Sequence, residues 1–191
     1  IAFDYIKDPQ GMLPIVSVMS EIAGNTSILI AAEYLSSLHK GQGQMFGGIS
    51  GVSPTEVVIL GAGTVGEFAA RSALGLGASV KVFDNSTHKL RRLQSMLGQR
   101  VATSVIQPKV LEKALKTADV VIGAISSTVA RAPIVVTEEM VSQMKDFSVI
   151  VDVSIDKGGC IETSEVTSHD APIFSKYGVI HYCVPNIASR V

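Results

Sequence analysis

The fold of this chain is decided by one stretch of its sequence, Val57-Val58-Ile59-Leu60-Gly61-Ala62-Gly63-Thr64-Val65-Gly66. Its first four residues are all apolar, which is typical of a short strand that is buried on both faces of a sheet. The G-x-G-x-x-G pattern that follows opens a helical stretch from about Thr64 to Leu76, with Gly77 suited to its C′ position. The stretch therefore predicts a strand, a tight glycine turn and a helix in direct succession.

Each glycine of this turn has a separate physical role. Gly61 permits the tight turn, Gly63 leaves the backbone open to a close ligand, and Gly66 lets the helix pack directly on the strand. The unpaired N–H groups at the start of the helix then face a phosphate group. A plain strand-to-helix turn is the alternative, but the flanking strand and helix favour a site for the pyrophosphate of a dinucleotide.

Outward from this turn, apolar strands alternate with helical stretches along the rest of the chain. We expect strands at residues 57–60, 80–83, 101–105, 120–124, 149–153 and 179–184, and helices at residues 64–76, 87–97, 109–116 and 137–144. Such alternation implies right-handed crossovers between parallel strands. The sequence therefore predicts an α/β fold, a doubly wound and mostly parallel sheet of the NAD(P)-binding Rossmann type, with strand order 3-2-1-4-5-6.

The N-terminal part of the chain has a different character. Ser20 is expected to cap a helix that continues to Leu35, and the stretch 41–54 holds five glycines, which indicates a loop or linker. This helix either covers its own sheet or contacts another domain or subunit. We expect residues 1–55 to form an N-terminal segment with an interdomain helix and a glycine-rich linker, and residues 56–191 to form the dinucleotide-binding domain. Because the chain lacks an initiator Met, we also expect it to be part of a longer protein.

Composition narrows the classes of partner. Hydrophobic residues make up 47% of the chain, and the formal net charge of −1 gives no electrostatic reason to expect nucleic acid or an anionic membrane. No uninterrupted apolar run reaches the roughly 18 residues of a membrane span. The four histidines lack metal-ligand spacing, so we expect no metal site. Cys160 and Cys183 lack a CxxC pattern, which favours buried structural thiols and fits a cytoplasmic compartment.

Asp84 indicates which dinucleotide the chain takes. It ends the second predicted strand, 18 residues after Gly66. A carboxylate there accepts hydrogen bonds from both hydroxyls of the adenosine ribose and repels a 2′-phosphate. No Arg lies within residues 85–89 to reverse that preference. The position therefore predicts NAD rather than NADP, with a solvated aspartate at the end of a strand as the alternative.

Polar residues also follow the later strands of the predicted sheet. Ser126 and Ser127 follow the fourth strand, Asp156 the fifth and Asn186 the sixth. Ligands of such sheets collect outside the carboxyl ends of the strands, where the strand order reverses. There the serines would border the nicotinamide half of the cofactor, and the Asp156 carboxylate would hold a cationic amine or iminium. The alternatives are turn serines, a loop-solvated aspartate and an asparagine amide that bonds only its own turn.

Four runs of sequence together resemble alanine dehydrogenase. They are the fingerprint within Val57–Gly77, the run Val149–Ser164 with its Asp-x-Gly-Gly-Cys-x-Glu-Thr-Ser pattern, the run His181–Val184, and the run Met19–Gly24. They span nearly the whole chain, and the second is far more selective than the glycine fingerprint. The NAD-binding component of proton-translocating transhydrogenase shares the fold and matches these runs less well.

The resemblance implies an NAD-dependent oxidative deamination of L-alanine to pyruvate and ammonia, together with its reverse. Hydride would pass from the α-carbon of the substrate to the cofactor, and Asp156 would be the catalytic residue that stabilises the cationic imine and ammonium. The positions that line the cofactor would be Ser20, Gly61, Gly63, Thr64, Val65, Gly66, Asp84, Lys89, Ile125, Ser126, Val153 and Asn186. The family is typically hexameric and cytoplasmic, so the resemblance also implies a homohexamer.

Two segments depart from the family pattern. The loop after the fourth strand has Ser126-Ser127-Thr128 where the family often has Pro-Gly, and the C-terminal run has Pro185-Asn186-Ile187-Ala188 where it often has Ala-Asn-Met-Pro. The family's substrate-binding Arg and Lys and its catalytic His belong to a preceding domain with no equivalent here. We therefore expect a substrate domain outside this chain. The chain by itself would then bind NAD but show no alanine dehydrogenase activity. The alternative functions are the transhydrogenase component and a non-catalytic NAD(H)-sensing module, in which Asp156 has no role.

Overall fold

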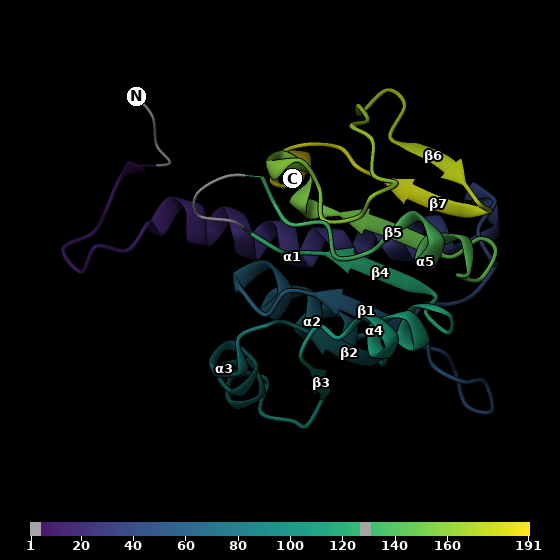
Figure 1. Ribbon diagram of the computed structural model, residues 1–191, viewed down its shortest axis with the longest axis horizontal. Coiled ribbons are helices and arrows are strands. Elements are labelled where there is room, and N and C mark those ends of the chain that lie inside the picture. The colour runs from purple at the N-terminus through teal and green to yellow at the C-terminus, as the bar shows by residue number, and fades with distance from the viewer. Residues whose placement is uncertain (1–4, 127–130) are drawn as a thin grey trace.

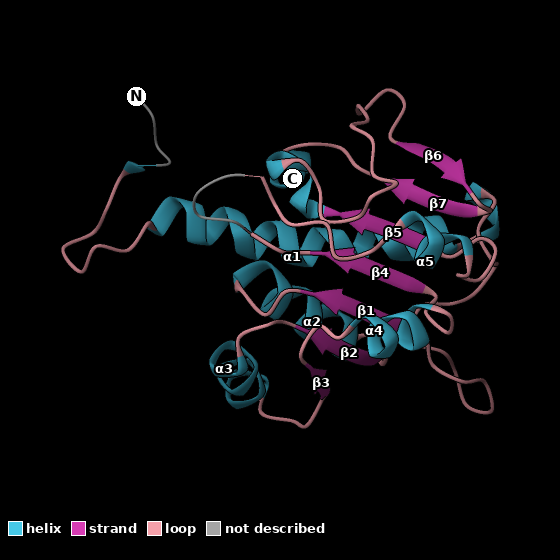
Figure 2. Ribbon diagram, in the orientation of Figure 1, coloured by secondary structure: helices cyan, strands magenta, loops and turns pink. Residues whose placement is uncertain are grey.

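The computed structural model describes residues 5–126 and 131–191. Figures 1 and 2 show one sheet with helices on both of its faces. The helices are α1 (Pro14–Leu35), α2 (Thr64–Gly75), α3 (Thr87–Leu97), α4 (Pro108–Leu115) and α5 (Glu138–Ser142), with 3-10 turns η2 (Ser37–His39), η3 (Val153–Lys157) and η4 (Ile187–Arg190). The strands are β1 (Glu56–Leu60), β2 (Ser79–Phe83), β3 (Ala102–Ser104), β4 (Val120–Gly123), β5 (Val149–Asp152), β6 (Ile173–Lys176) and β7 (Val179–Tyr182).

The sheet has the predicted doubly wound topology with one additional strand. Its order is β3-β2-β1-β4-β5-β7-β6, and the neighbours from β3 to β7 are parallel. The predicted order is confirmed, because β7 is the strand expected sixth. The edge strand β6 was not predicted, and it pairs antiparallel with β7. Its signal is the turn at Tyr177 and Gly178, whose φ angles of 55° and 74° suit a two-residue hairpin.

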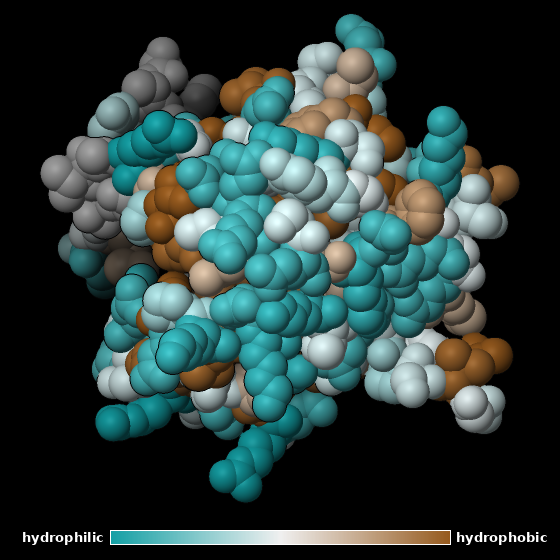
Figure 3. All heavy atoms as spheres, turned by 45° about the vertical axis from the view of Figure 1, so that its right-hand side comes forward, coloured by the Kyte–Doolittle hydropathy of each residue, from teal (hydrophilic) through white to brown (hydrophobic). Residues whose placement is uncertain are grey.

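The apolar run of β1 divides its side chains between two separate cores. Val57 and Ile59 belong to the cluster beneath α1, α2 and α3, whereas Val58 and Leu60 belong to the cluster beneath α4 and α5. Successive side chains of a strand point to opposite faces, so a strand covered on both sides needs apolar residues throughout. Most apolar side chains lie inside these two cores. The face in Figure 3 is accordingly mainly hydrophilic, with hydrophobic residues in separate groups.

The start of α1 corrects one prediction. The helix begins at Pro14, Leu13 occupies the N-cap position, and no side chain caps the helix. Ser20 therefore lies inside α1 and does not cap it. A proline suits the first helical position because its φ angle is already helical and its missing N–H would have no partner there. Pro14 supplies the start signal that we expected from Ser20.

α1 is also, within the described ranges, the helix that is long and apolar enough to cross a membrane by length and composition. Its sequence contains no long uninterrupted apolar run, because Ser, Glu, Asn and Thr residues lie among the apolar ones. In the structure α1 packs closely on α2, since a Cβ atom at Gly24 would lie 2.5 Å from the carbonyl oxygen of Val65. Ile28 and Leu35 of α1 are fully buried in the same cluster as Val57 and Ile59 of β1. This helix therefore covers the sheet of its own chain (Figure 1).

His181 of β7 is a buried histidine that the fold keeps neutral. Its ring is 0% exposed and stacks on Phe174 with ring centroids 4.7 Å apart. Nδ1 lies 3.0 Å from the carbonyl oxygen of Val179, and Nε2 lies 2.8 Å from Oγ1 of Thr163. Because a carbonyl only accepts, Nδ1 carries the proton and the Thr163 hydroxyl donates to Nε2. Burial lowers the pKa of His181 from 6.5 to about 4.

This histidine is expected to make the fold sensitive to acid. Below pH 6.5 the unfolded chain binds a proton at His181 that the native state takes up only near pH 4. Stability attributable to His181 is therefore present above pH 6.5 and falls by about 3 kcal/mol as the pH drops through this window. Urea unfolding at a series of pH values measures the loss. His181→Gln, which cannot titrate, should lose less stability than the parent over the same range, and exposed His88→Gln should lose as much as the parent. Equal losses in the parent and His181→Gln would contradict the assignment.

Candidate functional site

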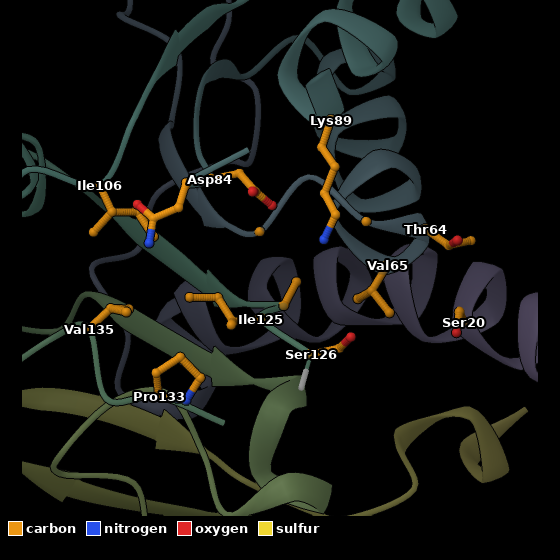
Figure 4. Close-up of a pocket in the computed structure, with 14 residues that line it drawn as sticks. Ser20, Thr64, Val65, Asp84, Lys89, Ile106, Ile125, Ser126, Pro133 and Val135 are labelled. Atoms are coloured by element: carbon orange, nitrogen blue, oxygen red, sulfur yellow. The ribbon is translucent and has the colours of Figure 1, made fainter. Parts of the chain in front are cut away.

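A cavity of about 280 Å³ opens at the carboxyl ends of β1, β2 and β4. Figure 4 shows the side chains of Asp84, Lys89, Val65 and Ser126 around it. Its lining residues are Ser20, Gly61, Gly63, Thr64, Val65, Asp84, Asn85, Lys89, Ile106, Ala124, Ile125, Ser126, Pro133 and Val135. The cavity therefore lies at the switch point of the strand order, where the ligands of doubly wound sheets bind.

Most of the predicted cofactor residues line this cavity, and four of the predicted site residues do not. Gly66, Val153, Asp156 and Asn186 lie outside it. The lining residues that the sequence did not predict are Asn85, Ile106, Ala124, Pro133 and Val135. Ile106 follows β3 and Ala124 follows β4, so the same rule about strand ends identifies both. Ser127, which was expected beside Ser126, lies outside the described residues.

The glycine turn has the geometry that a bound phosphate requires. Gly61 has a φ angle of +112°, and a Cβ atom there would lie 2.4 Å from the carbonyl oxygen of Ala124. A Cβ at Gly66 would lie 1.9 Å from the carbonyl oxygen of Gly61, so α2 packs directly on the turn. Gly63, in contrast, has nothing within 4 Å of its ideal Cβ position and lines the cavity. The turn is therefore closed on its protein side and open toward the cavity.

The start of α2 offers its amide groups to that open side. Gly63 occupies the N-cap position and no side chain caps the helix. The first helical bond is donated by the amide of Glu67 to the carbonyl of Gly63, so the earlier amides of the first turn have no partner within the helix. Thr64 and Val65, which carry two of these amides, line the cavity. Such an N-terminus attracts a phosphate group.

Asp84 joins the glycine turn to the loop after β2. Its Oδ2 accepts a hydrogen bond from the amide of Ala62 at 2.8 Å, and its Oδ1 accepts one from the amide of Ser86 at 2.7 Å. Each carboxylate oxygen has a further lone pair, so both can also accept from a ligand hydroxyl. Lys89 extends from the first turn of α3 into the same cavity (Figure 4). The cavity thus combines one half-buried carboxylate with one ammonium group.

Asp156 and Asn186 form a second group beyond the carboxyl ends of β5 and β7. Asp156 lies in η3, and its Oδ1 accepts a hydrogen bond from the backbone amide of Asn186 at 2.7 Å. Asn186 adopts a φ angle of 52° and precedes η4. Val153 and Ala124 follow neighbouring strands, because Gly123 pairs with Asp152 across β4 and β5. The sequence predicted that both residues would face the crevice at the strand ends. In the structure they contact each other outside the cavity, and the Asp156 carboxylate is exposed.

The thiols and other metal-binding groups offer no second site in the part of the chain that the structure describes. Both cysteines are buried, and burial raises the pKa of Cys183 to about 12 and that of Cys160 well above its ordinary value. Neither thiol is therefore a nucleophile at neutral pH. Among residues 5–126 and 131–191 no group of three or more His, Cys, Asp or Glu residues is arranged to hold a metal ion.

The comparisons with known proteins agree with this geometry. Residues 27–191 match the family described as alanine dehydrogenase/PNT, C-terminal domain. The alanine dehydrogenase of Mycolicibacterium smegmatis is 44% identical over 191 residues, which cover 100% of this chain and 52% of that protein. The alanine dehydrogenase of Methanococcus maripaludis is 45% identical over 192 residues, which cover 100% of this chain and 52% of the relative. The chain thus spans about half the length of these curated relatives.

Two solved structures extend the comparison to the fold. An L-alanine dehydrogenase matches with a TM-score of 0.92 and 41% identity, covering 100% of this chain and 55% of that one. A transhydrogenase from Sinorhizobium meliloti matches with a TM-score of 0.75 and 25% identity, covering 92% of this chain and 49% of that one. The family match covers most of the chain, and the cavity lies where that fold binds its ligand. This chain belongs to the family of alanine dehydrogenase/PNT C-terminal domains.

Proposed function

We propose that this chain is the NAD-binding part of an alanine dehydrogenase, with residues 56–191 as the dinucleotide-binding domain and residues 1–55 as the segment that joins it to a substrate domain. The observation that carries the proposal is a single cavity lined by both the glycine turn and Asp84, which are joined by the hydrogen bond from the Ala62 amide. Similarity to alanine dehydrogenases over the whole chain supports the choice of reaction. The remaining half of such a protein would hold the carboxylate of the substrate and supply the acid–base group.

The geometry of the glycine turn fits NAD. A side chain at Gly63 would project into the cavity, so the glycine leaves that space to a pyrophosphate. The free amides of Thr64 and Val65 would bind its oxygens, and the Asp84 carboxylate would accept from the ribose hydroxyls. Ser20, Lys89, Ile125 and Ser126 would contact the rest of the molecule. When bound, NAD would accept a hydride from the substrate, which is chemistry that the cofactor itself supplies.

Replacing Asp84 by Ala is expected to weaken NADH binding by about 1–3 kcal/mol, because hydrogen bonds to a charged group are lost. The loss of the Ala62 contact at 2.8 Å should loosen the glycine turn as well. Calorimetry with NADH and NADPH measures both effects, and the preference for NADH should narrow because the charge that repels a 2′-phosphate is gone. Asp170→Ala removes an exposed carboxylate elsewhere and should change neither constant. An unchanged dissociation constant for NADH would remove Asp84 from the cofactor site.

Asp156 is the residue that we assign to the reacting end of the site. Its charge would stabilise the substrate ammonium and the cationic imine that follows hydride loss. Asn186 donates its amide to one carboxylate oxygen and so holds the group in one orientation. Val153 and Asn186 would border the nicotinamide end from the neighbouring strand ends. We extend the proposal to a homohexamer in the cytoplasm, and the buried thiols fit a reducing compartment.

The function is tested by assaying the full-length protein for NADH formation from L-alanine and NAD. Turnover with alanine supports the proposal. NADH binding without turnover of any amino acid would favour an NAD(H)-sensing module instead. Hydride exchange between NADH and an NADP analogue, in the presence of a membrane-bound partner component, would favour the transhydrogenase function that the match at 25% identity leaves as the second candidate.

A further inference from the structure

Asp152 is a buried carboxylate beneath the residues assigned to the reacting end of the site. It is the last residue of β5 and is 1% exposed. Among the described residues, no Lys, Arg or His forms an ion pair with it, and hydrogen bonds satisfy it instead. Its Oδ1 accepts from the amide of Ser154 at 3.0 Å, and its Oδ2 accepts from the amide of Cys160 at 3.1 Å and from the hydroxyl of Ser164 at 2.7 Å. The Cys160 thiol lies 3.7 Å from Oδ1 as a fourth, weaker donor.

All of these donors belong to the single segment of chain that carries Asp156. Residues 153–164 leave the sheet after β5 and contain only the short turn η3 as regular structure. Ser154 lies at the start of the segment, Cys160 near its middle and Ser164 at its end. The Asp152 carboxylate therefore fixes three points of the segment to one place at the end of β5, and Asp156 lies between the first two of them.

The space around the carboxylate is as restricted as its hydrogen bonds. A Cβ atom at Gly123 would lie 2.5 Å from Oδ1 of Asp152, and a Cβ at Gly159 would lie 3.0 Å from Oδ2. Gly159 also has a φ angle of +77°, which favours glycine independently of space. The two glycines leave room for a carboxylate of this length in this position. A buried carboxylate without a cation is costly unless its hydrogen bonds are complete.

Burial opposes the charge of Asp152 and the surrounding donors support it. Burial raises the pKa of Asp152, whereas the Ser164 hydroxyl and the amides of Cys160 and Ser154 act in the opposite direction. An apolar residue at this position would avoid the buried charge but would leave the amides of Ser154 and Cys160 without their acceptor. The Asp152 carboxylate is therefore matched to one conformation of the segment that supplies its donors.

We propose that Asp152 is a positioning residue for the reaction, whose buried carboxylate holds the segment 153–164 so that Asp156 is presented beside Asn186 at the sheet edge. The inference rests on the proposed function of Asp156. The 2.7 Å hydrogen bond from the Asn186 amide joins Asp156 to the loop after β7. That bond requires the segment 153–164 to keep its position relative to the end of β5. Asp152 acts through Asp156 and does not itself contact the substrate.

Asp152→Asn in the full-length protein tests the proposal. The amide group of Asn has one accepting oxygen and a donating nitrogen, so either the Ser154 amide or the Cys160 and Ser164 donors would face another donor. We expect kcat with alanine to fall by about 10²-fold, since a displacement of roughly 1 Å costs that much. NADH affinity should stay at the parental value, and amide hydrogen exchange should accelerate within residues 153–160 while strands β1 and β4 keep their protection.

A milder pair of variants covers the case in which Asp152→Asn does not fold. Ser164→Ala removes the 2.7 Å hydrogen bond alone and should lower kcat about tenfold. Ser164→Thr keeps a hydroxyl at this position, so its kcat should lie closer to the parental value than that of Ser164→Ala. Exposed Ser175→Ala is the matched control and should leave kcat unchanged. Full activity and unchanged hydrogen exchange in Ser164→Ala would overturn the proposal.

A double-mutant cycle separates this inference from the function on which it rests. If Asp152 acts through Asp156, then Ser164→Ala should cause no further loss of kcat in an Asp156→Asn background. Losses that multiply would show that the network acts by a different route and would overturn the positioning role. An Asp156→Asn single variant with parental kcat would instead defeat the proposed function of Asp156, whatever the Ser164 variants do.

Discussion

Asp156→Asn in the full-length protein is expected to lower kcat for alanine oxidation by about 10²–10³-fold, the usual cost of removing one preorganised electrostatic group from an active site. The substitution keeps an oxygen that can accept the hydrogen bond from the Asn186 amide, so the geometry at 2.7 Å survives while the charge is lost. Because Asp156 lies outside the cavity that contains the glycine turn, the affinity for NADH should stay the same. Steady-state kinetics and NADH fluorescence titration measure the two quantities on one preparation.

Asp146→Asn is a useful control because it removes another exposed carboxylate, which precedes β5 and so lies at the opposite end of that strand from Asp156. It should leave both kcat and NADH affinity at the parental values. Full activity of Asp156→Asn would remove this residue from the mechanism. A large loss of NADH affinity in the same variant would instead place Asp156 at the cofactor, and its role would have to be assigned anew.

Gly66→Ala is expected to weaken NADH binding by at least about 100-fold. The added methyl group would lie 1.9 Å from the carbonyl oxygen of Gly61, which belongs to the backbone of the turn and cannot rotate away as a side chain could. Overpacking of roughly 3 kcal/mol follows, and it is relieved only when α2 moves away from β1. That movement carries the free amides of Thr64 and Val65 away from the cavity. Titration with NADH and circular dichroism together separate lost binding from lost folding.

The same helix supplies the control for this substitution. Gly75 is the last residue of α2, and its ideal Cβ position has nothing within 4 Å. Gly75→Ala should therefore raise stability by about 0.5–1 kcal/mol, because Ala is the better helix former, and leave NADH affinity unchanged. If Gly66→Ala binds NADH as tightly as Gly75→Ala does, then the close contact between α2 and the turn is not required for binding.

Much of this fold was predictable because its central strands are covered on both faces. Strands such as β1 and β5 show continuous apolar runs, and each run gives one strand. The edge strand β6 is only partly buried, so its sequence lacks such a run. The beginning of α1 was misplaced because Ser20 resembles a cap, whereas the helix starts with Pro14. Local patterns therefore locate buried elements better than edges and ends.

The candidate site divides in the same way. Asp84 and Ser126 line the cavity and were predictable because the carboxyl ends of parallel strands lie side by side. The same rule pointed to Asp156 and Asn186, which lie outside the cavity, so their place in the site stays a prediction. Pro133 and Val135 were not predictable, since their place depends on pairing between two loops that are distant in sequence. The isolated bridge between Val136 and Ile161 and the hydrogen bond from the Val135 amide to the carbonyl of Cys160 bring those loops together.

Asp152 shows what a sequence pattern leaves out. In the sequence it is one polar residue at the end of an apolar strand, with nothing in its spacing to distinguish it from a solvated strand end. Only the fold shows that donors from residues 154, 160 and 164 converge on it. Convergence of this kind depends on the path of a loop, and loop paths have no periodicity in the sequence.

The two outer strands of the sheet restrict how copies of this molecule can associate. An open strand edge is a template on which another chain can add, and long exposed edges lead to aggregation. Here β3 has only three residues, and the opposite edge strand β6 ends at Lys176, whose ammonium group lies 2.9 Å from Glu138. Short length at one edge and charge at the other both disfavour continuation of the sheet from molecule to molecule. Contacts between molecules are therefore directed to the helical and loop surfaces rather than to the edge strands.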